Sequence, residues 1–113
     1  MRLPNAERAL IDRTKLEGYL LSTAHPIGRF KARFFAALGF TADHWEVLEE
    51  ALREQHLHQD AEAGVQDEQG QRFSIRAILR GPTGASEMMV SVWFMRTGED
   101  HARFVTAYPG ETK

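Results

Sequence analysis

The sequence predicts an α+β fold, in which about three N-terminal helices pack on one face of a C-terminal antiparallel sheet of three to four strands. Two observations predict this fold class. Apolar residues recur at helical spacing as far as about residue 57, and from about residue 72 they alternate with polar residues. Because the helices come first and the strands last, the elements do not alternate as a parallel α/β sheet requires.

Length and composition are those of one globular domain spanning residues 1–113. The chain is 42% hydrophobic and 27% charged, which is too apolar for a disordered protein. It contains no cysteine, which excludes disulfides, a thiolate nucleophile and a cysteine zinc site. No segment approaches the roughly 18 to 20 apolar residues of a membrane span, and MRLPNAERAL lacks the apolar run of a secretory signal. We therefore expect a cytoplasmic protein with no membrane partner.

Charged residues are distributed unevenly along the chain. Residues 1–40 hold seven Lys or Arg against three Asp or Glu, residues 41–70 hold one against nine, and residues 71–113 hold six against four. This distribution permits a basic face with an acidic helix turned away from it. A localised basic face is the usual electrostatic footprint of a protein that binds nucleic acid.

Three helices are predicted from capping residues and apolar spacing. Asp12 or Thr14 can cap the first helix. Pro26 fits the first turn of the second, and Gly39 can end it. Thr41 can cap the third. The side chains expected to face the core are, helix by helix, Leu16, Tyr19 and Leu20; Ile27, Phe30, Phe34 and Leu38; and Trp45, Leu48, Leu52 and Leu57.

Turn-rich segments separate the predicted strands, which cover residues 72–79, 88–94 and 102–108, with a weaker one near 61–66. Alternation groups Phe73, Ile75, Ala77 and Leu79 on the first of these strands, and Met88, Val90, Val92 and Phe94 on the second. If Phe73 and Val90 both face the helices, Trp93 faces away from them. On the last strand, alternation places Phe104, Thr106 and Tyr108 on one side and Arg103, Val105 and Ala107 on the other, and the register decides which side is open.

The open side of such a sheet would combine arginines, hydroxyl groups and aromatic rings. These groups can hold a phosphodiester and stack a nucleic-acid base. The same pattern is also typical of the solvated face of an ordinary antiparallel sheet, so it does not by itself indicate a function.

His25 differs from the other histidines, because it stands just before a helix that carries Arg29, Lys31 and Arg33. Six residues separate His25 from Lys31, so both can reach the space at the N-terminus of this helix, where anions are favoured. Histidine exchanges protons near neutral pH, and lysine can stabilise the charge of a phosphorane. The alternative is a capping histidine beside a solvated basic face.

The other histidines are expected on the surface. His56 and His58 would lie at a solvated helix end, His44 near the start of a helix and His101 in a turn. A His-x-His pair without a third ligand does not predict a metal site. The sequence also lacks a nucleotide-binding glycine loop, a nucleophile elbow and a zinc-protease motif, so no cofactor is predicted.

Five segments of the chain carry a family resemblance: LPNAERALID, KLEGYLLSTAHPIGRFKARFFAALGF, GQRFSIRAILRGPTG, VSVWF and FVTAYP. They resemble a family of small bacterial domains of unknown function, found free-standing and as C-terminal tips of large secreted polymorphic and contact-dependent toxins. The most specific segment is the helix with His-Pro-x-Gly-x-x-Lys-Ala, followed by Leu-Gly-Phe. The helices-then-sheet order also resembles the ribonuclease fold of barnase, EndoU, tRNase colicins and RelE.

The resemblance implies a metal-independent ribonuclease of bacterial toxin type, in which the ribose 2′-hydroxyl attacks the adjacent phosphorus and the 5′-oxygen leaves. His25 would be the base or acid, and Lys31 would stabilise the phosphate. Thr106 and Tyr108 would bind substrate or handle protons. The implied partners are RNA and an antitoxin or immunity protein. The implied substrate-binding residues are Arg29 and Trp93. The alternative for Arg29 is a solvated cation, and the alternative for Trp93 is a residue of the core.

Other hypotheses remain open at this stage. The modest net acidity favours a non-catalytic protein-binding module, because a secreted ribonuclease is often basic. A homodimer joined along an edge strand is a third possibility, and the sequence leaves the oligomeric state open. Arg76 departs from the family pattern, in which an acidic residue is frequent, so the resemblance assigns it no role.

Overall fold

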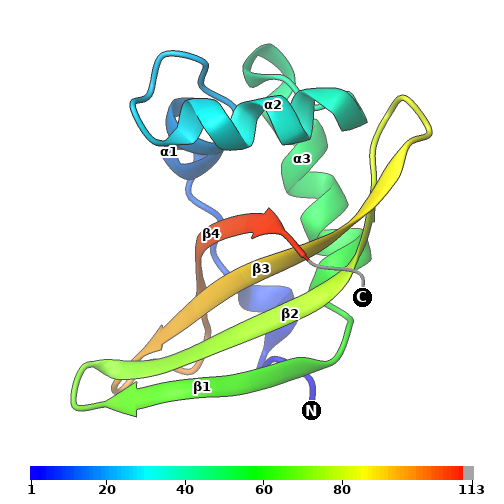
Figure 1. The fold of residues 1–113 in the computed structure, drawn as a ribbon. Helices are drawn as coiled ribbons and strands as arrows, with labels where there is room; N and C mark the ends of the chain where they lie inside the picture. The colour runs from blue at the N-terminus through cyan, green and yellow to red at the C-terminus, as the bar shows by residue number, and fades with distance from the viewer. Residues whose placement is uncertain (111–113) are drawn as a thin grey trace.

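The computed structural model describes residues 1–110, apart from the side chain of Phe30. Its helices and strands are α1 (Arg13–Lys15), α2 (Gly28–Leu38), α3 (Trp45–Ala51), β1 (Ala61–Asp67), β2 (Gly70–Arg80), β3 (Ser86–Arg96) and β4 (Arg103–Pro109) (Figure 1). Short 3-10 turns, Ala6–Arg8 and Ala42–His44, precede α1 and α3. π-helical turns extend α1 over Leu16–Leu20 and α3 over Leu52–His56. The predicted α+β class is confirmed.

The strands form one antiparallel sheet in the order β1-β2-β3-β4, and β1 is the weak strand that the sequence predicts. In Figure 1, α3 lies behind this sheet, while α1 and α2 lie beyond its β4 edge. In this view no helix is drawn in front of the strands. Within residues 1–110, no helix is both long enough and apolar enough to cross a membrane.

The pairing of β2 with β3 decides which side chains enter the core. Phe73 pairs with Trp93, and directly paired residues point to the same side of a sheet. The odd-numbered residues of both strands therefore face α3. Val90 and Val92 face the other way, so the expectation that Val90 joins Phe73 is wrong. We call this other side the open face; it carries the even-numbered residues of β2 and β3.

A bulge in β4 changes the alternation there. Val92 pairs with Thr106 and the next residue, Trp93, pairs with Phe104, which leaves Val105 as an extra residue. Phe104 consequently enters the core, while Thr106 and Tyr108 lie on the open face. A strict two-residue alternation had placed all three on one side, and it is wrong for Phe104.

The buried face of α2 also differs from the expected one. Ile27 is 64% exposed and Phe34 is half-buried, while Phe35 is completely buried. The prediction for Leu38 is confirmed, and that for Phe30 falls on a side chain outside the described residues. The expected face followed an apolar spacing of three, four and four residues. The helix instead buries Gly28, Ala32, Phe35 and Leu38, which are also at helical spacing.

His56 lies in the core, so its predicted place at a solvated helix end is wrong. Its ring accepts a hydrogen bond from the Ser91 hydroxyl at Nδ1 (2.8 Å) and donates from Nε2 to the carbonyl of Ala77 (3.2 Å). The hydroxyl of Ser91 accepts in turn from the indole N–H of Trp93 (2.9 Å). Each side-chain polar group of this His56–Ser91–Trp93 network has a hydrogen-bond partner, which a buried polar network requires.

Candidate active site

Three separate segments of the chain meet around the ammonium group of Lys31. This group donates to the hydroxyl of Tyr19 (2.9 Å) and to that of Thr106 (2.9 Å). The Thr106 hydroxyl lies 3.5 Å from that of Tyr19. Tyr19 comes from the π-helical turn after α1, Lys31 from α2 and Thr106 from the open face of β4. The three residues form a closed triangle of polar groups, which we call the Lys31 cluster.

Gly28 allows α2 to come close enough for this contact. A Cβ added to Gly28 would stand 1.9 Å from the carbonyl oxygen of Tyr19, so only glycine fits there. Lys31 follows three residues later, one helical turn along α2. At the other end Gly39 takes φ of 101°, a left-handed conformation that ends the helix as predicted.

The His25 side chain holds the start of α2. Its Nδ1 atom accepts hydrogen bonds from the backbone N–H groups of Ile27 (3.1 Å) and Gly28 (3.0 Å). The His25 ring stands edge-on to the ring of Tyr19, with centroids 5.0 Å apart. Because Nδ1 accepts both bonds, Nε2 carries the ring proton. His25 is therefore both the cap of α2 and a hydrogen-bond donor beside the Lys31 cluster.

The two hydrogen bonds that Tyr19 accepts change its acidity. The bond from Lys31, followed by that from Thr106, lowers the pKa of the Tyr19 hydroxyl, because both stabilise the phenolate. A phenol oxygen can accept two bonds and donate one, so the Tyr19 proton remains available to a third partner. An ammonium has three N–H bonds, and one of those of Lys31 likewise remains for a ligand.

The remaining predicted site residues lie in different environments. Tyr108 shares the open face with Thr106 and is 41% exposed. Arg29 is exposed on the first turn of α2. Trp93 is completely buried against Phe104, with ring centroids 5.2 Å apart, so the base-stacking role is wrong and the core alternative is correct. The register explains this, since Trp93 faces the helices.

Tyr19 is the functional candidate that the sequence analysis missed. Its spacing with Leu16 and Leu20 predicts core packing, and those two leucines are indeed completely buried. Tyr19 itself is only half-buried. A phenol on an otherwise apolar helix face, shortly before a His-Pro turn, could have indicated a polar partner nearby. Its partner Lys31 could not be inferred, because the contact depends on how closely α2 approaches.

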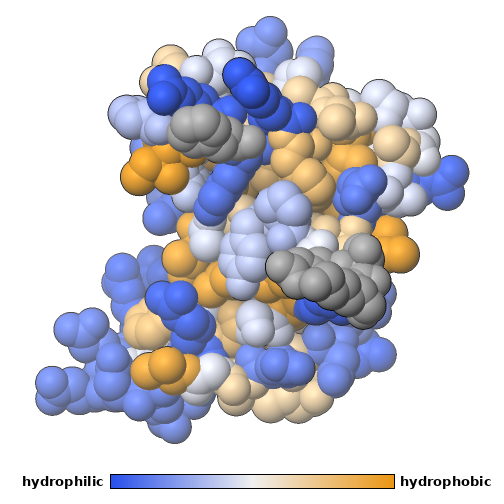
Figure 2. All heavy atoms as spheres, viewed as in Figure 1, coloured by the Kyte–Doolittle hydropathy of each residue, from blue (hydrophilic) through white to orange (hydrophobic). Residues whose placement is uncertain are grey.

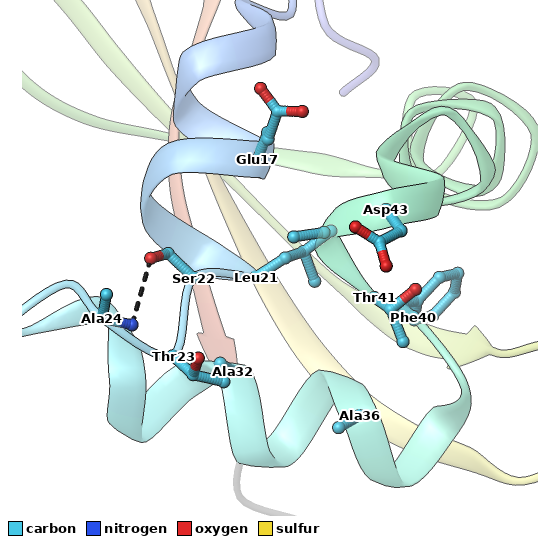
Figure 3. Close-up of a pocket in the computed structure, with 11 residues that line it drawn as sticks. Glu17, Leu21, Ser22, Thr23, Ala24, Ala32, Ala36, Phe40, Thr41 and Asp43 are labelled. Carbon is cyan, nitrogen blue, oxygen red and sulfur yellow. Dashed lines mark hydrogen bonds between the residues drawn. The ribbon is translucent and has the colours of Figure 1, made fainter.

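A hollow beside α2, away from the Lys31 cluster, has the wrong chemistry for an anion (Figure 3). Its volume is about 280 Å³, and Ala32 and Ala36 of α2 form part of its wall. Glu17 and Asp43 contribute carboxylates, and the described residues that line it include no lysine, arginine or histidine. A phosphate would be repelled there, whereas the Lys31 cluster offers a cation and two hydroxyl groups.

The surface around the cluster is mixed rather than uniformly polar. Figure 2 shows strongly hydrophilic residues on α2 at the top of the viewed face, above weakly polar and apolar residues over the sheet. The acidic residues Glu46, Glu50 and Glu54 are exposed on α3 and its extension, which lies behind the sheet.

Within residues 1–110, no three His, Asp or Glu side chains are grouped in a way that could hold a metal ion.

Comparison with known proteins gives one match. A family described as a domain of unknown function (DUF6883) matches residues 2–111. The chain belongs to the DUF6883 family. No curated protein and no solved structure matched it. The expected membership of a family of domains of unknown function is thus confirmed for this DUF6883 domain. The match does not extend to any toxin or ribonuclease family.

Proposed function

We propose that this DUF6883 domain is a ribonuclease that cleaves RNA through attack of the ribose 2′-hydroxyl, without a metal ion. The observation that carries the proposal is the Lys31 ammonium, bonded to the hydroxyl groups of Tyr19 and Thr106 beside an open sheet face. Such a group combines a fixed positive charge with a proton donor of lowered pKa. Phosphoryl chemistry requires both, and the charge acts most strongly where it is already positioned.

The scissile phosphate would bind between Lys31 and His25. The remaining N–H of Lys31 and the Nε2–H of His25 are both donors, and the start of α2 adds the positive end of a helix dipole. In this arrangement His25 donates to a phosphate oxygen. It does not act as the base through Nδ1, because that atom already accepts two backbone hydrogen bonds.

The reaction then needs one proton donor for the leaving group, and Tyr19 fits this role. The 2′-oxygen forms a bond to phosphorus and gives its proton to water, while the bond from phosphorus to the 5′-oxygen breaks. Tyr19 transfers its proton to the departing 5′-oxygen, and Lys31 and Thr106 stabilise the resulting phenolate. The products are a 2′,3′-cyclic phosphate and a free 5′-hydroxyl, and solvent returns the proton to Tyr19.

The proposal extends to the setting of the protein. A ribonuclease of this kind in the cytoplasm would meet cellular RNA, and a host that makes it would need a neutralising partner, such as an antitoxin or immunity protein. A partner that inhibits the enzyme by occlusion would have to cover the Lys31 cluster. Tyr108 and Arg29 would then contact either the RNA or this partner, since both side chains are exposed.

Incubation of total RNA with the purified protein in EDTA tests the proposal. We expect cleavage by the wild type and at least about 100-fold slower cleavage by Lys31→Met, which keeps the aliphatic stem and removes the charge. Arg33→Met is the matched control, because Arg33 is an exposed cation on the same helix. Intact RNA with the wild type, or equal loss of activity in both variants, would contradict the proposal.

A further inference from the structure

The pairing register arranges side chains of the open face in rows that run across the strands. From β4 across β3 to β2, the first central row consists of Thr106, Val92 and Ser74. The second consists of Tyr108, Val90 and Arg76. Neighbouring strands lie about 4.8 Å apart, so the β2 members stand about 10 Å from the β4 members. The first row begins at the Lys31 cluster, since Thr106 is a member of both.

The middle of each row is an apolar floor. Val90 and Val92 are only 9% and 4% exposed, and α2 reaches this face at Thr106 through Lys31. Their neighbours must therefore stand above them. Tyr108 pairs with Val90 on the same face and is 41% exposed, so part of its side chain is accessible to a ligand.

Two arginines border this floor on β2. Arg72 and Arg76 are both exposed, and within residues 1–110 neither makes an ion pair or a side-chain hydrogen bond. Four residues of a strand span about 14 Å, and both side chains point to the open face. Two unpaired cations at such a distance can contact separate phosphates of one backbone.

Acidic groups limit where a polyanion could lie. Glu62 of β1 pairs with Ser74 and so places a carboxylate at the far end of the first row. The acidic surface of α3 is behind the sheet. These carboxylates disfavour a negatively charged chain at β1 and behind the sheet, and the cations favour one between the Lys31 cluster and β2.

We propose that the open face binds the single-stranded RNA that flanks the cleaved phosphate. This inference rests on the proposed ribonuclease function and extends it to the class of substrate. Arg72 and Arg76 neutralise phosphates beyond the cleavage site, and a base stacks on Tyr108. Stacking of this kind needs an unpaired base, because the bases of a duplex already stack on one another and hide their faces. The substrate is thus a single strand or a loop.

The test measures binding separately from cleavage. The probe is an eight-nucleotide 2′-O-methyl RNA, which lacks the attacking hydroxyl, and its Kd is measured by fluorescence anisotropy at several salt concentrations. We expect the double variant Arg72→Gln/Arg76→Gln to raise the Kd about tenfold. We also expect it to reduce the slope of log K against log salt by about 0.7 for each lost phosphate contact. Tyr108→Ala should weaken binding about tenfold without changing that slope.

The matched control is Arg80→Gln. Arg80 is also an exposed, even-numbered residue of β2, but it stands at the end of the strand, where it lines a hollow with Glu50 and Glu54. Its loss should therefore change the Kd less than twofold. A duplex of the same sequence should bind at least tenfold more weakly than the single strand.

Each outcome separates this inference from the proposed function. If the wild type cleaves RNA while the double variant binds the probe as well as the control does, the inference is wrong and the function stands. If the probe binds in an arginine-dependent way and RNA stays intact, the face binds RNA and the ribonuclease proposal is wrong. No binding by the wild type, or tighter binding of the duplex, would overturn the inference.

Discussion

Gly28 and Tyr19 are in backbone contact, and this contact sets the position of the candidate site. The first turn of α2 lies so close to Tyr19 that a Cβ on Gly28 would stand 1.9 Å from its carbonyl oxygen. The same approach brings the Lys31 ammonium within 2.9 Å of the Tyr19 hydroxyl. The backbone geometry at one residue thus controls a side-chain contact one helical turn away.

Substitution of Gly28 by alanine is expected to separate Lys31 from Tyr19. The added methyl group must displace backbone atoms, which we expect to cost about 1–3 kcal/mol of unfolding free energy despite the better helix propensity of alanine. RNA cleavage should fall more than the loss of stability accounts for. Urea denaturation and a cleavage assay on the folded fraction measure the two effects.

Gly18→Ala is the control for this prediction. Gly18 lies in the π-helical turn next to Tyr19, and a Cβ added there meets no atom within 4 Å. Its substitution should leave activity unchanged and stability equal or slightly higher. Equal behaviour of the two alanine variants would show that the close approach at Gly28 has no functional role.

Tyr19→Phe tests the proton donor. A general acid must be protonated to act, so activity should fall on the alkaline side as Tyr19 loses its proton, below its ordinary pKa of about 10. The phenylalanine variant should lose about 100-fold or more in kcat/KM, and this alkaline decline should disappear. Tyr108→Phe should keep the decline. A pH profile that is unchanged in Tyr19→Phe would exclude Tyr19 as the acid.

His25→Asn separates the two roles of this histidine. Asparagine can cap a helix through its side-chain oxygen, but it lacks a donor at the position of Nε2. We expect an unfolding free energy within about 1 kcal/mol of the wild type and a loss of about tenfold or more in kcat/KM. His25→Ala should lose both stability and activity. Full activity of His25→Asn would limit His25 to capping.

The fold class follows from the sequence because period and order are local properties. Helical spacing up to Leu57, alternation from Phe73 and turn residues between the strands are all visible in the chain itself. The face that each strand presents is different, since it depends on the partner strand. The pairing of Phe73 with Trp93 reverses the face expected for β3. The extra residue Val105 separates Phe104 from Thr106 and Tyr108 on β4.

The part of the candidate site that depends on local spacing was also predictable from the sequence. His25 and Lys31 lie six residues apart at the start of one helix, and both lie beside the ring of Tyr19. Thr106 was expected from the family resemblance, and the structure places it beside Lys31. Tyr19 could not be found by spacing, because it reaches the cluster only through the close approach at Gly28.

His56 leads to a prediction about acid stability. Burial lowers its pKa to about 4, because the charged ring would lose its hydration inside the core. The unfolded chain, with a pKa near 6.5, binds more protons between these two values. The stability that His56 contributes is therefore complete above about pH 6.5 and is lost as the pH falls toward 4. The total loss is roughly 3 kcal/mol.

Urea denaturation between pH 5 and 7 isolates this effect. The carboxylates of Asp12, Glu99 and Asp100 also have lowered pKa values, but they titrate mainly below this window. We expect the wild type to lose roughly 2 kcal/mol across the window. His56→Gln should be less stable at pH 7 and show a nearly flat dependence, whereas His58→Gln, which changes an exposed neighbour, should keep the wild-type slope. If His56→Gln keeps the slope as well, another group is responsible for the acid sensitivity.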